Sequence, residues 1–303
     1  MNIQLKQAYS FIQKGKRGNQ EDARFPDADM PGRYSRFFVV CDGVGGNKCG
    51  EVASRMVCDA IGDYLSGKDW EQEFTQDDFR RALESVYRKM EQATDRTNRG
   101  MATTLVFAAF HSGGCLLAHI GDSRIYQIRP GLGLLYRSED HSLVNSLVHS
   151  GCITPEQAEN YPDSNVIIRS MSVVEEDKEK PCATIIQIQD VCPGDYFFLC
   201  TDGVLNKLSD ERLEQILNEA ITDREKCMEI ASLCKDSDDN NTAILVPVGE
   251  VECQVGDDHT EVEVGGNTAT RMVCQPIRGS QEETVRTATS LKSNIIRFIS
   301  DLF

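Results

Sequence analysis

The sequence Arg36-Phe-Phe-Val-Val-Cys-Asp-Gly43 gives the strongest indication of the fold. Phe37 to Cys41 form a short, uninterrupted apolar run, which is typical of a buried β-strand. The run ends abruptly at Asp42-Gly43, a pair of residues that favours a turn. Apolar residues at three- and four-residue spacing then predict a helix over about 51–65. This part of the chain therefore predicts a strand, a turn that carries an acid, and a helix.

The rest of the chain mixes both kinds of element. A second helix is predicted over about 77–97, while Ser209 and a Thr222/Glu225 capping box mark the starts of two later helices. The runs 183–189 and 195–200 form a pair joined across Pro193-Gly194-Asp195. Helices first, then strands, then a mixture indicate an α+β protein and not a βαβ alternation. Short β-rich runs are predicted at 102–110, 115–120, 123–128, 183–189, 195–200 and 242–248.

Composition limits the possible partners and compartment. The chain has 303 residues, 40% of them hydrophobic, and its formal charge is 32 − 48 = −16. Without a basic run, such an acidic chain argues against nucleic acid and anionic membrane as partners. No apolar stretch is long enough to span a bilayer, and the first residues lack the plan of a signal peptide. None of the 12 cysteines forms a C-x-x-C pair, which favours reduced structural cysteines and a cytoplasmic protein.

A change of character near residue 249 divides the chain. We interpret 1–248 as the main domain and 249–303 as a C-terminal extension, which begins with an acidic segment. Ser280 and Glu283 form a capping-box pattern ahead of apolar residues that repeat at helical spacing. This amphipathic helix would either pack against the main domain or dock a partner protein.

The most informative feature is the position of the acids. Asp42 and Asp122 each end a predicted strand, Asp202 follows one, and Asp239 precedes another, while the pair Glu21-Asp22 stands before the first strand. One Asp-Gly step after a strand is usually an ordinary turn. If several of these strand tips converge, their carboxylates need compensation, which a hard divalent cation provides. Oxygen ligands favour Mg²⁺ or Mn²⁺, and two such ions could present a bridging water to a phosphoryl group.

Several stretches together resemble one family. The chain is similar, in order across residues 14–248, to the metal-dependent protein phosphatases of type 2C, and more closely to their compact bacterial branch. The resemblance rests on these stretches: Lys14-Gly-Lys-Arg-Gly-Asn-Gln-Glu-Asp-Ala23, Val40-Cys-Asp-Gly-Val-Gly-Gly46, Ala102-Thr-Thr-Leu105, Ile120-Gly-Asp-Ser-Arg-Ile-Tyr126, Glu139-Asp-His-Ser-Leu-Val144, Thr201-Asp-Gly-Val204 and Asp239-Asn-Asn-Thr242.

The resemblance implies a four-layer α/β/β/α sandwich that hydrolyses phosphoserine and phosphothreonine on proteins with two Mn²⁺ or Mg²⁺ ions. On this basis Asp42 would bridge the two metal ions, and the Gly43 carbonyl would bind the second. Asp202 and Asp239 would complete the first metal site. Glu21 would bind the second ion directly or through water.

Three further assignments come from the same resemblance. Asp22 would orient metal-bound waters, and Asp122, with Asp202, corresponds to a third metal position in bacterial members. Arg17 would hold the substrate phosphate, for which a planar bidentate donor is suited. Without the motif, Arg17 would be interpreted as a surface salt-bridge residue.

Residue 44 is Val in this chain, whereas some eukaryotic members of the family have His at this position. Metal-bound water or the solvation of the leaving group would then supply the proton, with His141 a less favoured donor. The rival function is a pseudophosphatase that binds phosphoproteins without turnover. Such proteins typically lose a metal ligand, whereas Asp42, Asp202 and Asp239 are all present. The expected partners are phosphorylated proteins and a cognate serine/threonine kinase, and the chain is expected to be a monomer.

Overall fold

The computed structural model describes residues 1–32, 34–44, 49–98, 100–158, 161, 166–173 and 180–252. The chain divides into two compact units, and both sheets belong to the first, formed by 1–142 and 167–254. In the second unit the structure describes two short helices, α3 (Leu143–His149) and α4 (Pro155–Ala158). The predicted C-terminal helix lies outside the described residues.

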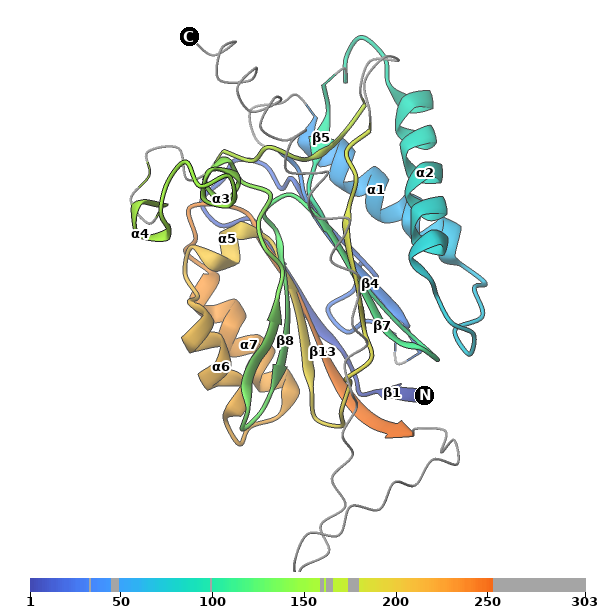
Figure 1. Ribbon diagram of the computed structural model, residues 1–303, viewed down its shortest axis with the longest axis vertical. Coiled ribbons are helices and arrows are strands. Elements are labelled where there is room, and N and C mark those ends of the chain that lie inside the picture. The colour runs from blue at the N-terminus through green and yellow to red at the C-terminus, as the bar shows by residue number, and fades with distance from the viewer. Residues whose placement is uncertain are drawn as a thin grey trace, which may run out of the picture. The chain divides into compact units, whose positions relative to one another are not determined.

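Two antiparallel sheets form the centre of the first unit (Figure 1). The six-stranded sheet has the order β1 (Asn2–Leu5), β13 (Asn241–Glu252), β12 (Tyr196–Cys200), β8 (Arg124–Arg129) and β9 (Gly133–Arg137), and β2 (Tyr9–Gln13) also pairs with β13. The five-stranded sheet has the order β11 (Thr184–Ile188), β7 (Gly114–Ile120), β6 (Leu105–His111), β4 (Phe37–Asp42) and β3 (Asp22–Phe25). A short ribbon pairs β5 (Ala102–Thr103) with β10 (Met171–Ser172).

Strand β4 shows why its sequence is apolar throughout. Phe37, Val39 and Cys41 pack on the helix side of their sheet, whereas Phe38 and Val40 face the other sheet. Because successive side chains of a strand point to opposite faces, a strand between two packed layers needs apolar residues at every position. Strands β12 and β13 repeat this division, so the six-stranded sheet is also covered on both faces.

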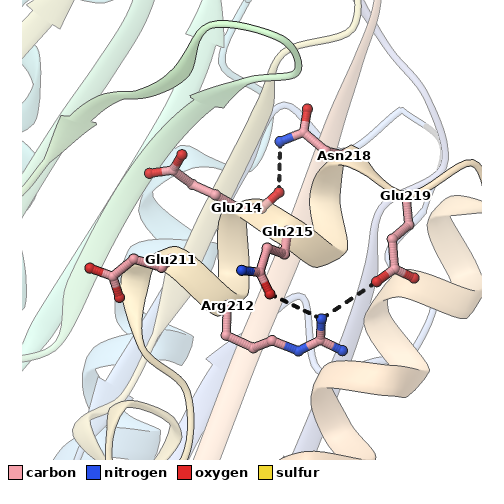
Figure 2. Close-up of a pocket in the computed structure, with 6 residues that line it drawn as sticks. All are labelled: Glu211, Arg212, Glu214, Gln215, Asn218 and Glu219. Carbon is pink, nitrogen blue, oxygen red and sulfur yellow. Dashed lines mark hydrogen bonds and ion pairs between the residues drawn. The ribbon is translucent and has the colours of Figure 1, made fainter.

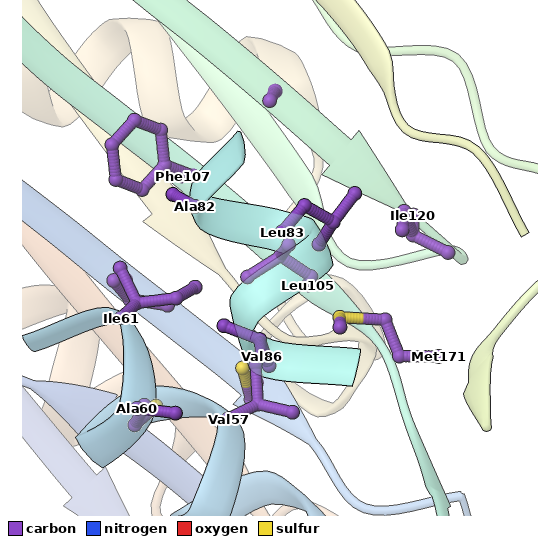
Figure 3. Packing of buried hydrophobic residues seen from close by; sticks show 14 of the residues in the cluster. Val57, Ala60, Ile61, Ala82, Leu83, Val86, Leu105, Phe107, Ile120 and Met171 are labelled. Atoms are coloured by element: carbon purple, nitrogen blue, oxygen red, sulfur yellow. The ribbon is translucent and has the colours of Figure 1, made fainter. Parts of the chain in front are cut away.

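Helices cover the two outer faces. The first pair, α1 (Gly50–Leu65) and α2 (Gln76–Ala93), lies against the five-stranded sheet, and Figure 3 shows Val57, Ile61 and Val86 packed towards Phe107 of β6. The second pair, α6 (Asp210–Asn218) and α7 (Asp223–Cys234), covers the six-stranded sheet (Figure 1). The short helix α5 (Asp202–Leu205) follows β12 directly. The predicted four-layer α/β/β/α sandwich is confirmed.

Most local predictions agree with the structure. Ser209 caps α6, and Thr222 with Glu225 forms the predicted capping box of α7. One pairing was wrong: the runs 183–189 and 195–200 do not pair with each other, because β11 pairs with β7 and β12 pairs with β8 and β13 in the other sheet. Strand β13 also continues beyond residue 248 to Glu252, where Val251 pairs with Ile3 of β1. No helix among the described residues combines the length and the apolar character needed to cross a membrane.

Candidate metal centre

The strand register places the predicted aspartates at one end of the two sheets. Asp22 begins β3 directly opposite Asp42, which ends β4. In the other sheet, the last residue of β12, Cys200, is paired with the start of β8 and with the start of β13. Asp202 therefore follows β12 at the end from which β8 and β13 begin. We call this end, with Asp22, Asp42, Asp122, Asp202 and Asp239, the acidic rim.

Three of the rim acids interact directly. The carboxyl groups of Asp42 and Asp202 share a hydrogen bond, and loss of solvation followed by the charges of Asp22 and Asp202 raises the pKa of Asp42 well above its usual range. Burial raises the pKa of Asp22 to about 7, although the Thr201 hydroxyl donates to its Oδ2 atom at 3.0 Å. Burial also raises the pKa of Asp202. The structure thus holds like charges together, which carboxylates tolerate only with protons or cations.

Two buried oxygen atoms test whether this rim fits a metal ion. Oδ1 of Asp22 and Oδ1 of Asp202 are buried without a hydrogen-bond donor. An acceptor in that state has lost its solvation and gains from a cation. In the described part of the chain, no three His, Cys, Asp or Glu side chains already stand in the arrangement that a metal ion requires. The donor set nevertheless fits a hard cation, because all of these candidate ligands are oxygen atoms.

Close backbone packing places Gly43 and Glu21 beside this group. A Cβ atom on Gly43 would lie 2.4 Å from the Gly50 carbonyl carbon, so only glycine fits where β4 meets the start of α1. The Gly43 N–H donates to the Glu21 carbonyl at 3.1 Å, and the Ser54 hydroxyl donates to the same oxygen. Burial, followed by the charge of Glu51, raises the pKa of the Glu21 carboxyl group.

Asp122 occupies the turn between β7 and β8. Burial raises its pKa to about 7, with further contributions from the charges of Asp202 and Asp140. The turn is tied to β4 through Thr104, whose hydroxyl lies 2.7 Å from Ser123 Oγ and accepts a hydrogen bond from the Asp42 N–H at 3.0 Å. Asp122 therefore interacts electrostatically with Asp202 of the rim.

Arg17 and Asp239 form an ion pair. Nη2 of Arg17 donates to Oδ2 of Asp239 at 2.5 Å, while the Asn240 N–H donates to Oδ1 at 2.8 Å. The Arg17 side chain is 55% exposed, so its guanidinium group is accessible at the edge of the rim. The structure therefore places Arg17 on a predicted metal ligand, and its role in phosphate binding stays a prediction.

Asn240 is an organising residue to which the sequence analysis gave no role. Its side chain is buried and makes three hydrogen bonds: Nδ2 donates to the carbonyls of Lys14 and Asn19, and Oδ1 accepts from the Glu21 N–H. These bonds hold the loop of Arg17 and Glu21 against the start of β13. The signals in the sequence were its place in the stretch Asp239-Asn-Asn-Thr242 and its position directly after an acid that precedes a strand.

His141 is not placed as a proton donor to the reaction. Its Nδ1 atom accepts a hydrogen bond from the Gly121 N–H, and its Nε2 atom lies 2.9 Å from the Thr184 hydroxyl. Burial and the neighbouring Arg169 lower its pKa to about 3. The ring is therefore neutral near pH 7, and both nitrogen atoms already have partners.

A surface hollow of about 620 Å³ lies on α6 and is lined by none of the predicted site residues. Figure 2 shows that Arg212 reaches towards Gln215 and Glu219 across this surface, and that Asn218 bonds to the Glu214 carbonyl. Arg212, the cation of this surface, is already paired with Glu219 and Glu229, and the acidic rim remains the candidate site.

Comparison with known proteins agrees with this geometry. The sequence model of the family described as Protein phosphatase 2C matches residues 19–233. Protein phosphatase PhpP of Streptococcus pneumoniae is 31% identical over 251 residues, which cover 79% of this chain and 96% of that protein. The serine/threonine protein phosphatase PstP of Mycobacterium tuberculosis is 31% identical over 243 residues, which cover 77% of this chain and 43% of that protein.

Two solved structures show the same fold. The structure of the Mycobacterium tuberculosis serine/threonine phosphatase PstP/Ppp has a TM-score of 0.66 at 27% identity and covers 82% of this chain and 100% of that one. A structure of the catalytic domain of PstP in complex with 2 manganese ions has a TM-score of 0.64 at 26% identity, with coverage of 82% and 100%.

Proposed function

The chain belongs to the protein phosphatase 2C family and is a metal-dependent protein serine/threonine phosphatase, and on that premise we propose which of its residues carry the reaction. The supporting observation is the acidic rim, where burial and neighbouring charges raise the pKa values of Asp22, Asp42 and Asp202 and where two carboxylate oxygens lack donors. Held by these residues, two Mn²⁺ or Mg²⁺ ions would supply activated water and would neutralise the charge of the phosphoryl group.

We assign the ligands by their place at the rim. Asp42 would hold both ions, and the Gly43 carbonyl would hold the second. Asp202 and Asp239 would complete the first site, and Glu21 would contribute to the second. The support for this division is that Asp42 contacts Asp202 on one side, while its neighbour Gly43 contacts the Glu21 backbone on the other.

The remaining residues act on water, proton and substrate. Asp22, fixed by the Thr201 hydroxyl, orients water at the rim. Arg17 binds the substrate phosphate from the exposed edge, where its side chain leaves Asp239 for the phosphate oxygens. No imidazole at residue 44 is available as a general acid, so the leaving alkoxide takes its proton from solvent.

We further propose that the protein acts in the cytoplasm, as a monomer, on proteins phosphorylated by a cognate serine/threonine kinase. The support for this compartment is that all cysteines of the described residues are unpaired, including Cys41 and Cys58, which are fully buried in contact with each other. Neighbouring thiols that stay reduced are typical of a reducing compartment.

The test uses the purified full-length chain. After removal of metal with a chelator, hydrolysis of a phosphothreonine peptide should be absent and should return when Mn²⁺ is added. Asp42→Asn should abolish it, whereas Asp63→Asn should not, because Asp63 is an exposed α1 residue that pairs with Lys89. Full activity after exhaustive chelation, or a trapped phosphoenzyme, would contradict the mechanism. Binding of phosphopeptide without turnover in the presence of Mn²⁺ would instead identify a pseudophosphatase.

A further inference from the structure

The backbone just before Asp122 is held by one histidine. The Gly121 N–H donates to Nδ1 of His141 at 3.1 Å, and the His141 N–H donates to the Gly121 carbonyl at 2.9 Å. These two bonds run in opposite directions between the same pair of residues. They fix the N–H and the C=O of Gly121, which lie in the two peptide units on either side of its Cα, and the second of these units leads directly into Asp122.

The His141 ring is itself held on its other side. Since Nδ1 accepts from Gly121, the proton of the neutral ring lies on Nε2, which is 2.9 Å from the Thr184 hydroxyl and 3.2 Å from Nη1 of Arg169. The ring stacks on His119 with centroids 4.5 Å apart and an interplanar angle of 14°. His119 is anchored in turn, because its Nε2 atom lies 2.8 Å from the Glu139 carbonyl.

The turn has little freedom to find another arrangement. Gly121 has φ +104°, and a Cβ atom there would lie 2.7 Å from Cγ2 of Thr104. On the opposite side Ser123 bonds to Thr104, which also bonds to the backbone of Asp42. Asp122 is therefore clamped between Thr104, which connects it to the centre of the rim, and His141, which connects it to strand β11.

We propose that His141 is a positioning residue, which acts through the Gly121 backbone to hold the Asp122 carboxylate towards Asp202 so that the two can share a further cation. The proposal rests on the proposed function. His141 touches neither the cation nor the substrate, and its essential group is the Nδ1 acceptor. The bond from Nε2 to Thr184 only orients the ring.

Two substitutions distinguish the roles of the two ring nitrogen atoms of His141. In His141→Asn the amide oxygen can accept from the Gly121 N–H, as Nδ1 does, but the reach to Thr184 is lost. In His141→Gln the longer side chain can reach Thr184 but leaves the buried Gly121 N–H without its acceptor. Thr184→Val is the matched control, because it removes the hydroxyl partner of Nε2, which keeps its contact with Arg169, and leaves the Gly121 bond intact.

The experiment measures two quantities on full-length protein: the number of Mn²⁺ ions bound per chain, by calorimetry, and kcat on a small phosphate ester. His141→Gln should lose the weakest Mn²⁺ binding step and lower kcat to the same extent as Asp122→Asn does, because the Gly121 N–H that positions Asp122 has lost its acceptor. His141→Asn should recover most of both losses. Thr184→Val should bind Mn²⁺ as the wild type does.

A double-mutant cycle separates positioning from general structural damage. If His141 acts through Asp122, adding His141→Gln to Asp122→Asn should change neither quantity further. Multiplied losses in kcat, or equal impairment of the Gln and Asn variants, would overturn the proposal. Should His141→Gln fail to fold, a missing Mn²⁺ step in a folded His141→Asn variant would overturn it equally. If the wild type binds Mn²⁺ but hydrolyses no phosphate ester, the proposed function fails, while the Mn²⁺ comparison still decides the role of His141.

Discussion

Neutralising Asp122 should stabilise the metal-free protein. Burial and the charges of Asp202 and Asp140 raise the pKa of this carboxyl group to about 7 from an ordinary value of 3.8. Near neutral pH the folded, metal-free chain therefore retains a proton, or bears an unfavourable charge, at a group that ionises freely once the chain unfolds. Asp122→Asn keeps the size of the side chain and removes this penalty.

The size of the effect follows from linkage. Below pH 3.8 both states carry the proton, and the site imposes no penalty. Between pH 3.8 and 7 only the folded state carries it, so the free energy of unfolding falls by about 1.4 kcal/mol per pH unit as the pH rises. Above pH 7 the loss is complete, at about 4 kcal/mol for a shift from 3.8 to about 7. At pH 5 it is about 1.6 kcal/mol. Both values are upper bounds, because the turn can relax.

The assay is urea unfolding with a chelator present, followed by circular dichroism at pH 5 and pH 8. Asp122→Asn should be more stable than the wild type at both values, with the larger difference at pH 8. Asp63→Asn, on the exposed face of α1, is the control and should show no such pH dependence. Mn²⁺ should then narrow the difference at pH 8, because binding at 100 times Kd adds about 2.7 kcal/mol to the stability of the wild type. An Asp122→Asn variant that is less stable than the wild type at pH 8 without metal would refute the reasoning.

Three further predictions concern activity and the limits of the domain. Asp42→Asn should abolish hydrolysis while urea unfolding stays cooperative, and a wild-type rate would remove Asp42 from the centre. Arg17→Ala should raise KM more than it lowers kcat. The control Lys16→Ala should change neither quantity, because Lys16 pairs with the exposed Asp238. An unchanged KM in Arg17→Ala would show that Arg17 is only a surface cation. A chain ending at Glu252 should keep its activity on a small phosphate ester. It should also unfold at a higher urea concentration than a chain ending at Val248, which loses the pairing of Val251 with Ile3. Loss of activity in the chain ending at Glu252, with metal still bound, would show that the tail reaches the site.

The local features of the fold could be predicted because their causes are local. The apolar run at Phe37–Cys41 and the caps at Ser209 and Thr222 depend on neighbouring residues only, and the structure agrees with each. The partners of 183–189 and 195–200 could not be predicted in this way. A turn at Pro193-Gly194 is compatible either with a hairpin or with a crossing between sheets, and the choice depends on distant strands.

The residues of the candidate site likewise comprise some that the sequence could predict and some that it could not. The acids were found because a charge directly after an apolar strand stands out in a sequence, and antiparallel pairing then brings such tips to one rim. Asn240 and Thr201 stand in stretches that carry the family resemblance, but neither was given a role, because a neutral residue beside an acid does not show in the sequence which group it will bind. His141 drew attention as a titratable group, but its chemistry depends on which neighbour occupies Nδ1, and only the fold brings Gly121 there.

The neutrality of the supporting residues gives these observations a common explanation. Thr104 holds the backbone of Asp42, Thr201 holds the side chain of Asp22, and Asn240 holds the loop of Glu21, all through uncharged donors and acceptors. Had arginine or lysine residues held the acids instead, their charge would have lowered the pKa values and satisfied the carboxylates. Neutral supports fix the positions of Asp22, Asp42 and Glu21 and leave their charges uncompensated, whereas Asp239 pairs with Arg17. A rim built in this way keeps its negative charge for a divalent cation, and the exposed Arg17 can exchange Asp239 for a phosphate.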